Sequence, residues 1–222
     1  MIKKVLFSAV LFLFIPLYLH GVVGMTNWAK KLKGVQLYGV FFINELPPEY
    51  FEDFYNLYTK RLDYDEDNIR FNIHILNLAL SYPFRHPSRA LCLLKTVDEG
   101  KRYKRLLVMD AYFKIMKDYL TLGSLYDKKI IYYFNMPFKK DLKESLGYAK
   151  YYYNLAKDYW KKVLYYAGEA NKINARVDMD SLEDELYKIL HRDKFVDWDY
   201  DYTFKLHLKK LEANLKKLDS SK

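Results

Sequence analysis

The chain has 222 residues, of which 51% are hydrophobic and 18% aromatic, and its formal net charge is +9. This composition excludes a disordered chain, and the single cysteine, Cys92, excludes an intramolecular disulfide and a thiolate zinc cluster. Only 8 glycines and 6 prolines are present, which disfavours a turn-rich β-sandwich or a glycine-rich nucleotide-binding fold. The composition favours a helical protein.

Residues 1–24 show the three-part pattern of a secretory signal peptide. Two lysines precede the apolar run 5–19, and Val22 and Gly24 then provide small residues for cleavage. A signal-anchor formed by residues 5–24 is the alternative, since a spanning helix needs about 20 apolar residues. Both interpretations predict export, with a periplasmic location that the anchor would restrict to the inner membrane.

Residues 25–46 have a mixed pattern and are predicted to form an N-terminal arm. From Pro47 onward the apolar residues recur at helical spacing, which predicts one all-α domain over 47–222. The stripe of its first helix is Phe51, Phe54, Tyr58 and Leu62. Acidic residues at 63–67 then favour the start of a second helix. The stripe of that helix is Ile69, Ile73, Leu76 and Leu80.

A short third helix is predicted from about Pro87 to Val97, stopping near Gly100. A fourth helix follows and is expected to end near Gly123. Its apolar stripe is Leu106, Met109, Phe113, Met116 and Leu120. A further short helical piece is expected at 130–134.

The strongest pattern predicts one long central helix at about 141–172. Its apolar positions alternate steps of four and three: Leu142, Leu146, Ala149, Tyr153, Ala156, Trp160, Val163, Ala167 and Ala170. Tyr152, Tyr159 and Tyr166 recur every seven residues beside this stripe and widen it. Such a wide stripe is more than one partner helix needs.

Ser181 and Asp184 fit a variant of the capping box that opens a helix. The last helix is predicted to begin near Asp201, although alternation over 196–208 leaves a short strand open as an alternative. The prediction is therefore all-α: a helical bundle or short α-solenoid of six to eight helices. The expected core includes Phe54, Ile73, Leu76, Leu94, Leu107, Phe113, Met116, Ala149, Ala156, Trp160 and Val163.

No motif in the sequence specifies a catalytic, cofactor or metal site, so we expect a protein that is not an enzyme. Acidic triplets at 63–67 and 197–201 lack the later ligands of a calcium loop and are interpreted as helix caps. His74 is expected to flank an apolar stripe, and Cys92 to be a buried thiol. The basic cluster 101–105 contains an aromatic residue, as nucleic-acid-binding patches do, but the predicted export argues against nucleic acid as a partner. The cluster is interpreted as a solvated helix start, or as a contact for anionic lipid or an acidic protein.

The small and aromatic residues of one segment resemble a tetratricopeptide-type helix face: Tyr148, Ala149, Tyr153, Ala156, Tyr159 and Trp160. An exported, Lys- and Tyr-rich helical chain is also similar in style to spirochaetal periplasmic helical-repeat proteins. Some of those proteins are scaffolds of the flagellar collar. The resemblance implies a helical scaffold that binds other proteins.

The sequence therefore predicts a non-enzymatic exported scaffold or adaptor in a periplasmic or envelope-associated assembly, for example a flagellar one. Two alternatives stay open: an envelope enzyme or ligand-binding protein whose acidic groups converge only in the fold, and a surface protein that binds a host. The expected docking surface is the stripe Tyr152, Tyr159 and Tyr166, with Lys161 and Lys162 at its polar rim. The competing interpretation is that all three tyrosines pack within the chain.

Overall fold

The computed structural model describes residues 48–58, 65–128 and 138–220. Within these ranges the regular elements are all helical, which confirms the all-α prediction. The predicted signal segment, the arm at 25–46 and the helical piece at 130–134 lie outside the described residues.

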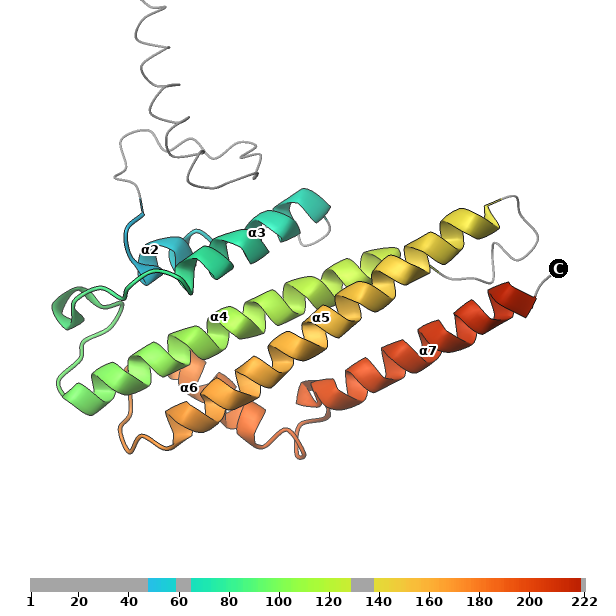
Figure 1. Cartoon of the computed structure of the whole chain (residues 1–222). Coiled ribbons are helices and arrows are strands. Elements are labelled where there is room, and N and C mark those ends of the chain that lie inside the picture. Colours follow the sequence, from blue (N-terminus) through green and yellow to red (C-terminus); the bar gives the residue numbers. More distant parts are fainter. Residues whose placement is uncertain (1–47, 59–64, 129–137, 221–222) are drawn as a thin grey trace, which may run out of the picture. The chain divides into compact units, whose positions relative to one another are not determined.

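Two long helices form the centre of the bundle (Figure 1). Helix α4 (Val97–Tyr126) runs antiparallel to α5 (Lys139–Asn171), and the two are in contact along much of their length. Helix α7 (Tyr200–Ser220) packs on α5, and α3 (Glu66–Ala79) packs on α4. The predicted long central helix is confirmed as α5.

Two shorter helices complete the bundle. Helix α2 (Phe51–Asn56) packs on α3, and α6 (Asp180–Leu190) contacts both α4 and α5. The order is therefore a row of α3, α4, α5 and α7, with α6 bridging the two central helices (Figure 1).

The predicted helix from Pro87 to Val97 is wrong, because only Pro87–Arg89 forms a single 3₁₀ turn. A capping box fixes the true start of α4. The amide of Glu99 donates to Thr96 Oγ1 at 3.1 Å, and the Glu99 carboxylate accepts from the Thr96 amide at 3.3 Å. The helix therefore begins at Val97 and continues through Gly100.

Gly123 does not end α4, as the sequence suggested, but lies inside the helix. A Cβ atom at this position would lie 2.4 Å from a ring carbon of Tyr153 on α5. The missing side chain leaves room for the Tyr153 ring between the two helices. The glycine is therefore a packing residue rather than a helix stop.

The core lies where α4 and α5 meet their neighbours. Trp160 is fully buried, with its ring 6.2 Å from Phe113 and 5.1 Å from Tyr200. Ten of the eleven predicted core residues are buried, and Leu94 is the error. Leu94 is only half-buried because it lies in the non-helical segment before the Thr96 cap. The buried members of the predicted set are Phe54, Ile73, Leu76, Leu107, Phe113, Met116, Ala149, Ala156, Trp160 and Val163.

Helix α6 begins at Asp180 without a side-chain cap, so the predicted capping box at Ser181 is wrong. The first turn is instead held by Glu183, whose carboxylate turns back toward α4 and the preceding loop. Helix α7 begins at Tyr200, close to the predicted start. The strand alternative for 196–208 is wrong, because the described chain there forms the 3₁₀ turn Val196–Trp198 and then α7. Cys92, expected to be buried, is half-buried.

Candidate functional site

Six tyrosines stack along the contact between the two central helices. Tyr112, Tyr119 and Tyr126 recur every seven residues on α4, as Tyr152, Tyr159 and Tyr166 do on α5. Because the helices are antiparallel, the two series interleave, with neighbouring ring centroids 5.4–6.3 Å apart. We call this set the tyrosine ladder. Offset and tilted rings at these separations attract each other.

Helix α3 supplies polar partners for the ladder. Arg70 donates to the Tyr152 hydroxyl at 2.5 Å, and the Tyr126 hydroxyl donates to Glu66 at 2.7 Å. The Tyr159 hydroxyl donates to Asn77 at 3.1 Å. These bonds satisfy phenol groups that burial takes out of water.

The stripe predicted to dock a partner therefore packs within the chain, which was the competing interpretation. Tyr152 is buried, and Tyr159 and Tyr166 are half-buried. The Lys162 ammonium lies 4.2 Å from the Tyr159 ring centroid, and Lys161 pairs with Asp158. Lys162 thus lies at the edge of the ladder, whereas Lys161, about 200° around the helix from Tyr159, lies on the other side of α5.

Other tyrosines of α5 do face the solvent beside the ladder. Tyr148, Tyr151 and Tyr165 are 47%, 58% and 61% exposed; we call them the α5 rim. Tyr151 and Tyr165 pack edge-on against their ladder neighbours, with centroids 5.4 Å and 5.1 Å apart. The exposed tyrosines of α5 are therefore not the three that the sequence predicted: Tyr148 and Tyr151 lie close together, and Tyr165 lies about 21 Å along the helix from Tyr151.

A second group of side chains forms a buried charge cluster: Tyr55 of α2, Asp110 and Lys114 of α4, and Glu185 of α6. Asp110 is 4% exposed, accepts a hydrogen bond from the Tyr55 hydroxyl and pairs with Lys114 at 2.6 Å. The Lys114 ammonium also donates to the Tyr55 oxygen at 2.8 Å. Burial and the neighbouring Asp110 raise the pKa of Tyr55 far above its ordinary value.

Glu185 is the carboxyl group of the cluster whose pKa is raised. Burial, followed by the charge of Asp110 and a hydrogen bond with it, raises the pKa of Glu185 to about 8. Lys114 and Lys117 oppose the shift, and Glu185 Oε2 is buried without a hydrogen-bond partner. The cluster can therefore hold a proton on Glu185 at neutral pH. Such perturbed groups occur at functional sites and in structural ion-pair networks.

The sequence alone does not reveal this cluster. Asp110 and Lys114 are four residues apart at the border of the apolar stripe of α4, which is the one local signal. Their partners Tyr55 and Glu185 come from other helices, and only the fold brings them together.

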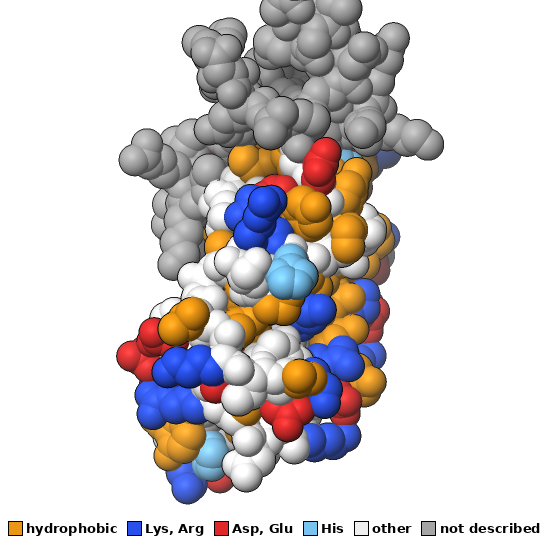
Figure 2. Space-filling model, turned by 90° about the vertical axis from the view of Figure 1, so that its left-hand side faces the viewer, with side chains coloured by type: hydrophobic (Ala, Val, Ile, Leu, Met, Phe, Trp, Pro, Cys, Tyr) orange, Lys and Arg blue, Asp and Glu red, His pale blue; other side chains and the backbone are white. Residues whose placement is uncertain are grey.

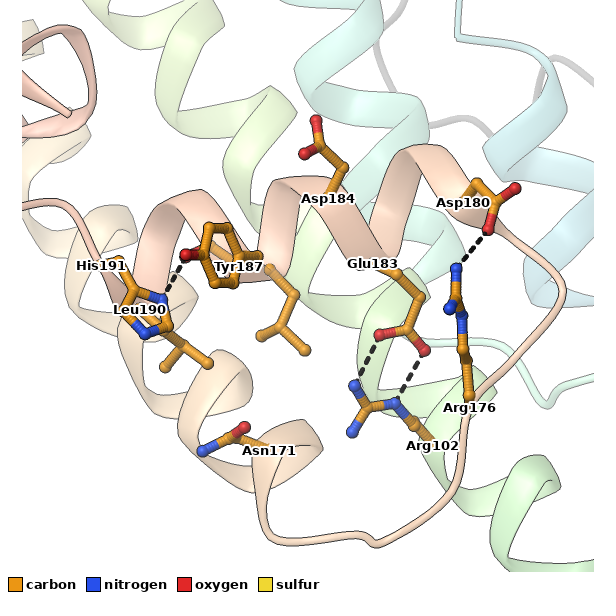
Figure 3. A pocket seen from close by; sticks show the side chains of 10 residues that line it. Arg102, Asn171, Arg176, Asp180, Glu183, Asp184, Tyr187, Leu190 and His191 are labelled. Atoms are coloured by element: carbon orange, nitrogen blue, oxygen red, sulfur yellow. Dashed lines mark hydrogen bonds and ion pairs between the residues drawn. The ribbon is translucent and has the colours of Figure 1, made fainter. Parts of the chain in front are cut away.

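An open depression with a volume of about 560 Å³ lies where α6 meets the end of α5 (Figure 3). Figure 3 shows Arg102, Arg176 and Glu183 at one side, and Tyr187 and His191 at the other. The His191 ring nitrogen Nδ1 lies 2.9 Å from the Tyr187 carbonyl oxygen. The lining side chains are Arg102, Asn171, Arg176, Asp180, Glu183, Asp184, Leu186, Tyr187, Leu190 and His191.

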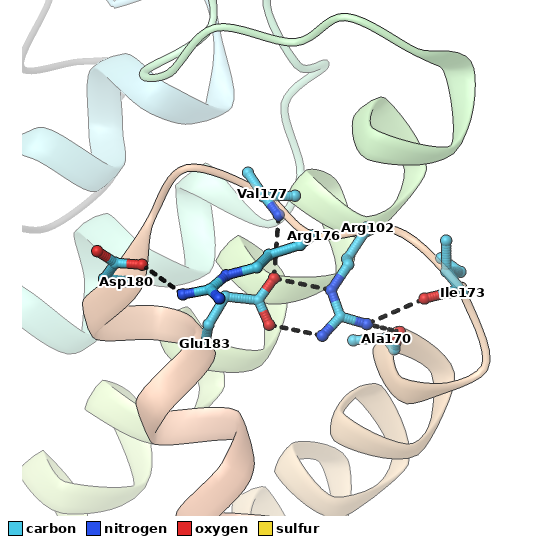
Figure 4. Close-up of polar contacts among 7 residues, drawn as sticks. All are labelled: Arg102, Ala170, Ile173, Arg176, Val177, Asp180 and Glu183. Atoms are coloured by element: carbon cyan, nitrogen blue, oxygen red, sulfur yellow. Dashed lines mark hydrogen bonds and ion pairs between the residues drawn. The ribbon is translucent and has the colours of Figure 1, made fainter.

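Arg102, one of the two arginines of this depression, makes four hydrogen bonds (Figure 4). Arg102 binds the Glu183 carboxylate through two hydrogen bonds of 2.8 Å and 2.5 Å. It also donates to the carbonyls of Ala170 and Ile173, at 2.8 Å and 3.0 Å, and so closes the end of α5. Glu183 accepts a further bond from the Val177 amide at 3.1 Å. This Arg102 junction joins α4, α5 and α6.

The basic cluster 101–105 is therefore not one continuous solvated patch. Arg102 is committed to the junction and Tyr103 is buried, while Lys101 pairs with Asp98. On the face shown in Figure 2, basic and acidic side chains lie interspersed with hydrophobic ones. This arrangement does not favour α4's start as the contact for anionic lipid or an acidic protein.

The acidic triplets act as helix caps where they are described. Asp65 accepts from the Asp67 amide at 3.1 Å, and Asp199 accepts from the Tyr202 amide at 3.0 Å. His74 is half-buried, and burial lowers its pKa. Among residues 48–58, 65–128 and 138–220, no three His, Cys, Asp or Glu side chains gather closely enough to hold a metal ion. Within these described ranges no helix has the length and apolar character needed to span a membrane.

The fold and these sites define an all-α bundle whose two central helices are joined by tyrosines. Residues 98–221 match the model of a family described as a domain of unknown function (DUF8513). The match covers more than half of the chain, from the start of α4 to the end of α7. The chain belongs to this family. Neither a curated protein nor a solved structure matches it.

Proposed function

We propose that the chain is an exported, non-enzymatic scaffold or adaptor that binds other proteins through a helix face. The assembly would be periplasmic or envelope-associated, for example flagellar. The observation that carries the proposal is the α5 rim, three exposed tyrosines on the longest helix of the described residues. Tyrosine is enriched at protein interfaces because it offers a large apolar face and a hydroxyl that tolerates solvent.

The rim is suited to docking because its support is rigid. At 100° per residue, Tyr148 and Tyr151 lie on neighbouring lines of α5, and half-buried Leu155 continues their stripe. The ladder rings behind Tyr151 and Tyr165 limit the rotamers of these side chains before a partner arrives. These tyrosines would then lose less side-chain entropy when a partner helix binds.

The double variant Tyr151→Ala/Tyr165→Ala tests this surface. We expect it to reduce recovery of crosslinked partners from native cells, while the free energy of unfolding changes by no more than about 1 kcal/mol, since both rings are largely exposed. The matched control is Leu93→Ala/Tyr187→Ala, which truncates two exposed apolar side chains that do not belong to α5. Equal recovery with both double variants, or recovery of the wild-type protein alone as a monomer, contradicts the proposal.

Export is tested separately. A reporter that is active only outside the cytoplasm should be active when fused to residues 1–40 and inactive when fused to residues 25–40. The apolar run 5–19 and its preceding lysines are the reason for this expectation. The intact mass of the native protein then separates cleavage after Gly24 from a retained signal-anchor. Activity of both fusions, or of neither, would overturn the interpretation of residues 1–24.

The buried charge cluster favours a second candidate, an envelope enzyme or ligand-binding protein. Asp110 and Glu185 form a carboxyl pair of the kind that serves acid–base chemistry, and Lys114 and Tyr55 lie beside it. Neither carboxyl lines the depression of Figure 3. This candidate would be preferred if a ligand raised the thermal unfolding temperature of the wild type but not that of Asp110→Asn.

A further inference from the structure

The charges of α7 lie in two adjoining sectors of the helix. Its three acidic residues are each directed at a basic neighbour. Asp219 pairs with Lys143 of α5 at 2.8 Å, and Glu212 lies 3.6 Å from Lys150 of α5. Asp201 lies 4.0 Å from Arg192. The acidic side chains of α7 are thus used along its contact with the bundle.

The sector of α7 next to these acids, on the side away from the buried residues, carries lysines without such partners. Lys205, Lys209, Lys216 and Lys217 are exposed and make no ion pair with the described part of the chain. Tyr202 and Leu206, both exposed, lie among them. We call these six residues the α7 lysine face. At 100° per residue they span a sector of roughly 120°, and the lysines extend over about 18 Å of the helix.

The three acidic residues border the sector without entering it: Glu212 lies about 20° from the line of Lys205, and Asp201 and Asp219 lie about 40° from it. Lys210, at its edge, is neutralised by Asp127 at 3.0 Å. Phe204, Leu211 and Leu218 are buried on the other side of the helix. Packing on α5 therefore explains the inner side of α7, and nothing in the fold requires the outer one to be basic.

We propose that the α7 lysine face docks on the surface of an anionic lipid bilayer. Its charge is complementary to such a surface, and each lysine close to anionic lipid contributes about 1 kcal/mol. One side of a straight helix matches a plane, and long lysine side chains can reach phosphates that have no fixed positions. Tyr202 and Leu206 would lie at the headgroup level, where aromatic and apolar side chains are favoured.

This inference goes beyond the proposed scaffold function and involves a different helix from the α5 rim. It assigns the contact with anionic lipid to α7 and not to the 101–105 cluster, because Arg102 and Tyr103 of that cluster pack within the chain. An acidic protein is the competing partner, and the experiment below distinguishes the two.

The test measures cosedimentation of the full chain with phosphatidylcholine vesicles, with and without about one third phosphatidylglycerol. The difference between the two vesicle types isolates the charge-dependent binding from any contribution of the apolar segment 5–19. For Lys205→Gln/Lys209→Gln/Lys216→Gln/Lys217→Gln we expect this charge-dependent partitioning to fall at least about tenfold. High salt should have a similar effect on the wild type.

The matched control, Lys95→Gln/Lys140→Gln/Lys157→Gln/Lys194→Gln, removes the same charge from exposed lysines outside α7. It should retain binding within about twofold. Circular dichroism confirms that both variants are folded. An equal loss in both variants would show a net-charge effect and overturn the proposal. Loss of binding to polyglutamate with unchanged vesicle binding would assign the face to an acidic protein and also overturn it.

Discussion

Replacing Arg102 by alanine is expected to lower the free energy of unfolding by about 3–5 kcal/mol. The Arg102 and Glu183 side chains are only 12% and 13% exposed. Truncation would leave the Glu183 carboxylate nearly buried with the Val177 amide as its remaining partner, and would remove the donor from the Ala170 and Ile173 carbonyls. Urea unfolding followed by circular dichroism measures the change.

The matched control is Arg176→Ala, because the Arg176–Asp180 pair in the same depression is 79% and 81% exposed. That change should cost less than about 0.5 kcal/mol. The double variant Arg102→Met/Glu183→Met should recover most of the loss, since removing both charges leaves neither of them buried. A cost below about 1 kcal/mol for Arg102→Ala would show that the junction does not hold α6 in place.

Glu185→Gln is expected to stabilise the protein at alkaline pH by roughly 2–4 kcal/mol. The pKa of Glu185 is raised from an ordinary 4.5 to about 8 in the folded state. Below about pH 4.5 the group is protonated in both states and contributes fully. As the pH rises toward 8, the unfolded state releases the proton while the folded state retains it, so stability falls. Glutamine stays neutral and can still donate to Asp110.

The measurement is the free energy of unfolding between pH 5 and pH 9 for both proteins. The two curves should approach each other at acidic pH and separate as the pH rises. Glu144→Gln makes the same chemical change on an exposed position of α5, and its curve should follow that of the wild type. A constant offset between wild type and Glu185→Gln at every pH would show that Glu185 is not protonated in the folded state.

The long helix and most of the core could be predicted because their signals are local. The four-and-three spacing from Leu142 to Ala170 contains both the helical period and the buried side of α5. The errors came where a residue's role depends on a distant partner. Gly123 resembles a helix stop until Tyr153, thirty positions away, is placed against it. Leu94 belongs to an apolar run, but the cap at Thr96 keeps that run out of the helix.

Only part of each candidate site could be predicted from the sequence. The tyrosines of α5 were recognised, while Tyr112, Tyr119 and Tyr126 repeat with the same period on α4 and could have been found in the same way. That the two series face each other follows from the antiparallel packing, which no local pattern specifies. The buried charge cluster shows only Asp110 and Lys114 locally, since Tyr55 lies 55 residues before Asp110.

The tyrosine ladder also restricts how the two central helices can change in length. Inserting one residue between Tyr112 and Tyr126 would rotate every later ring by about 100° and move it off its partner. Adding a whole heptad would return the rings to nearly the same side, with a drift of about 20°. Insertions and deletions compatible with the stacked rings therefore come in steps of seven residues. The ladder in this way limits the lengths that α4 and α5 can adopt.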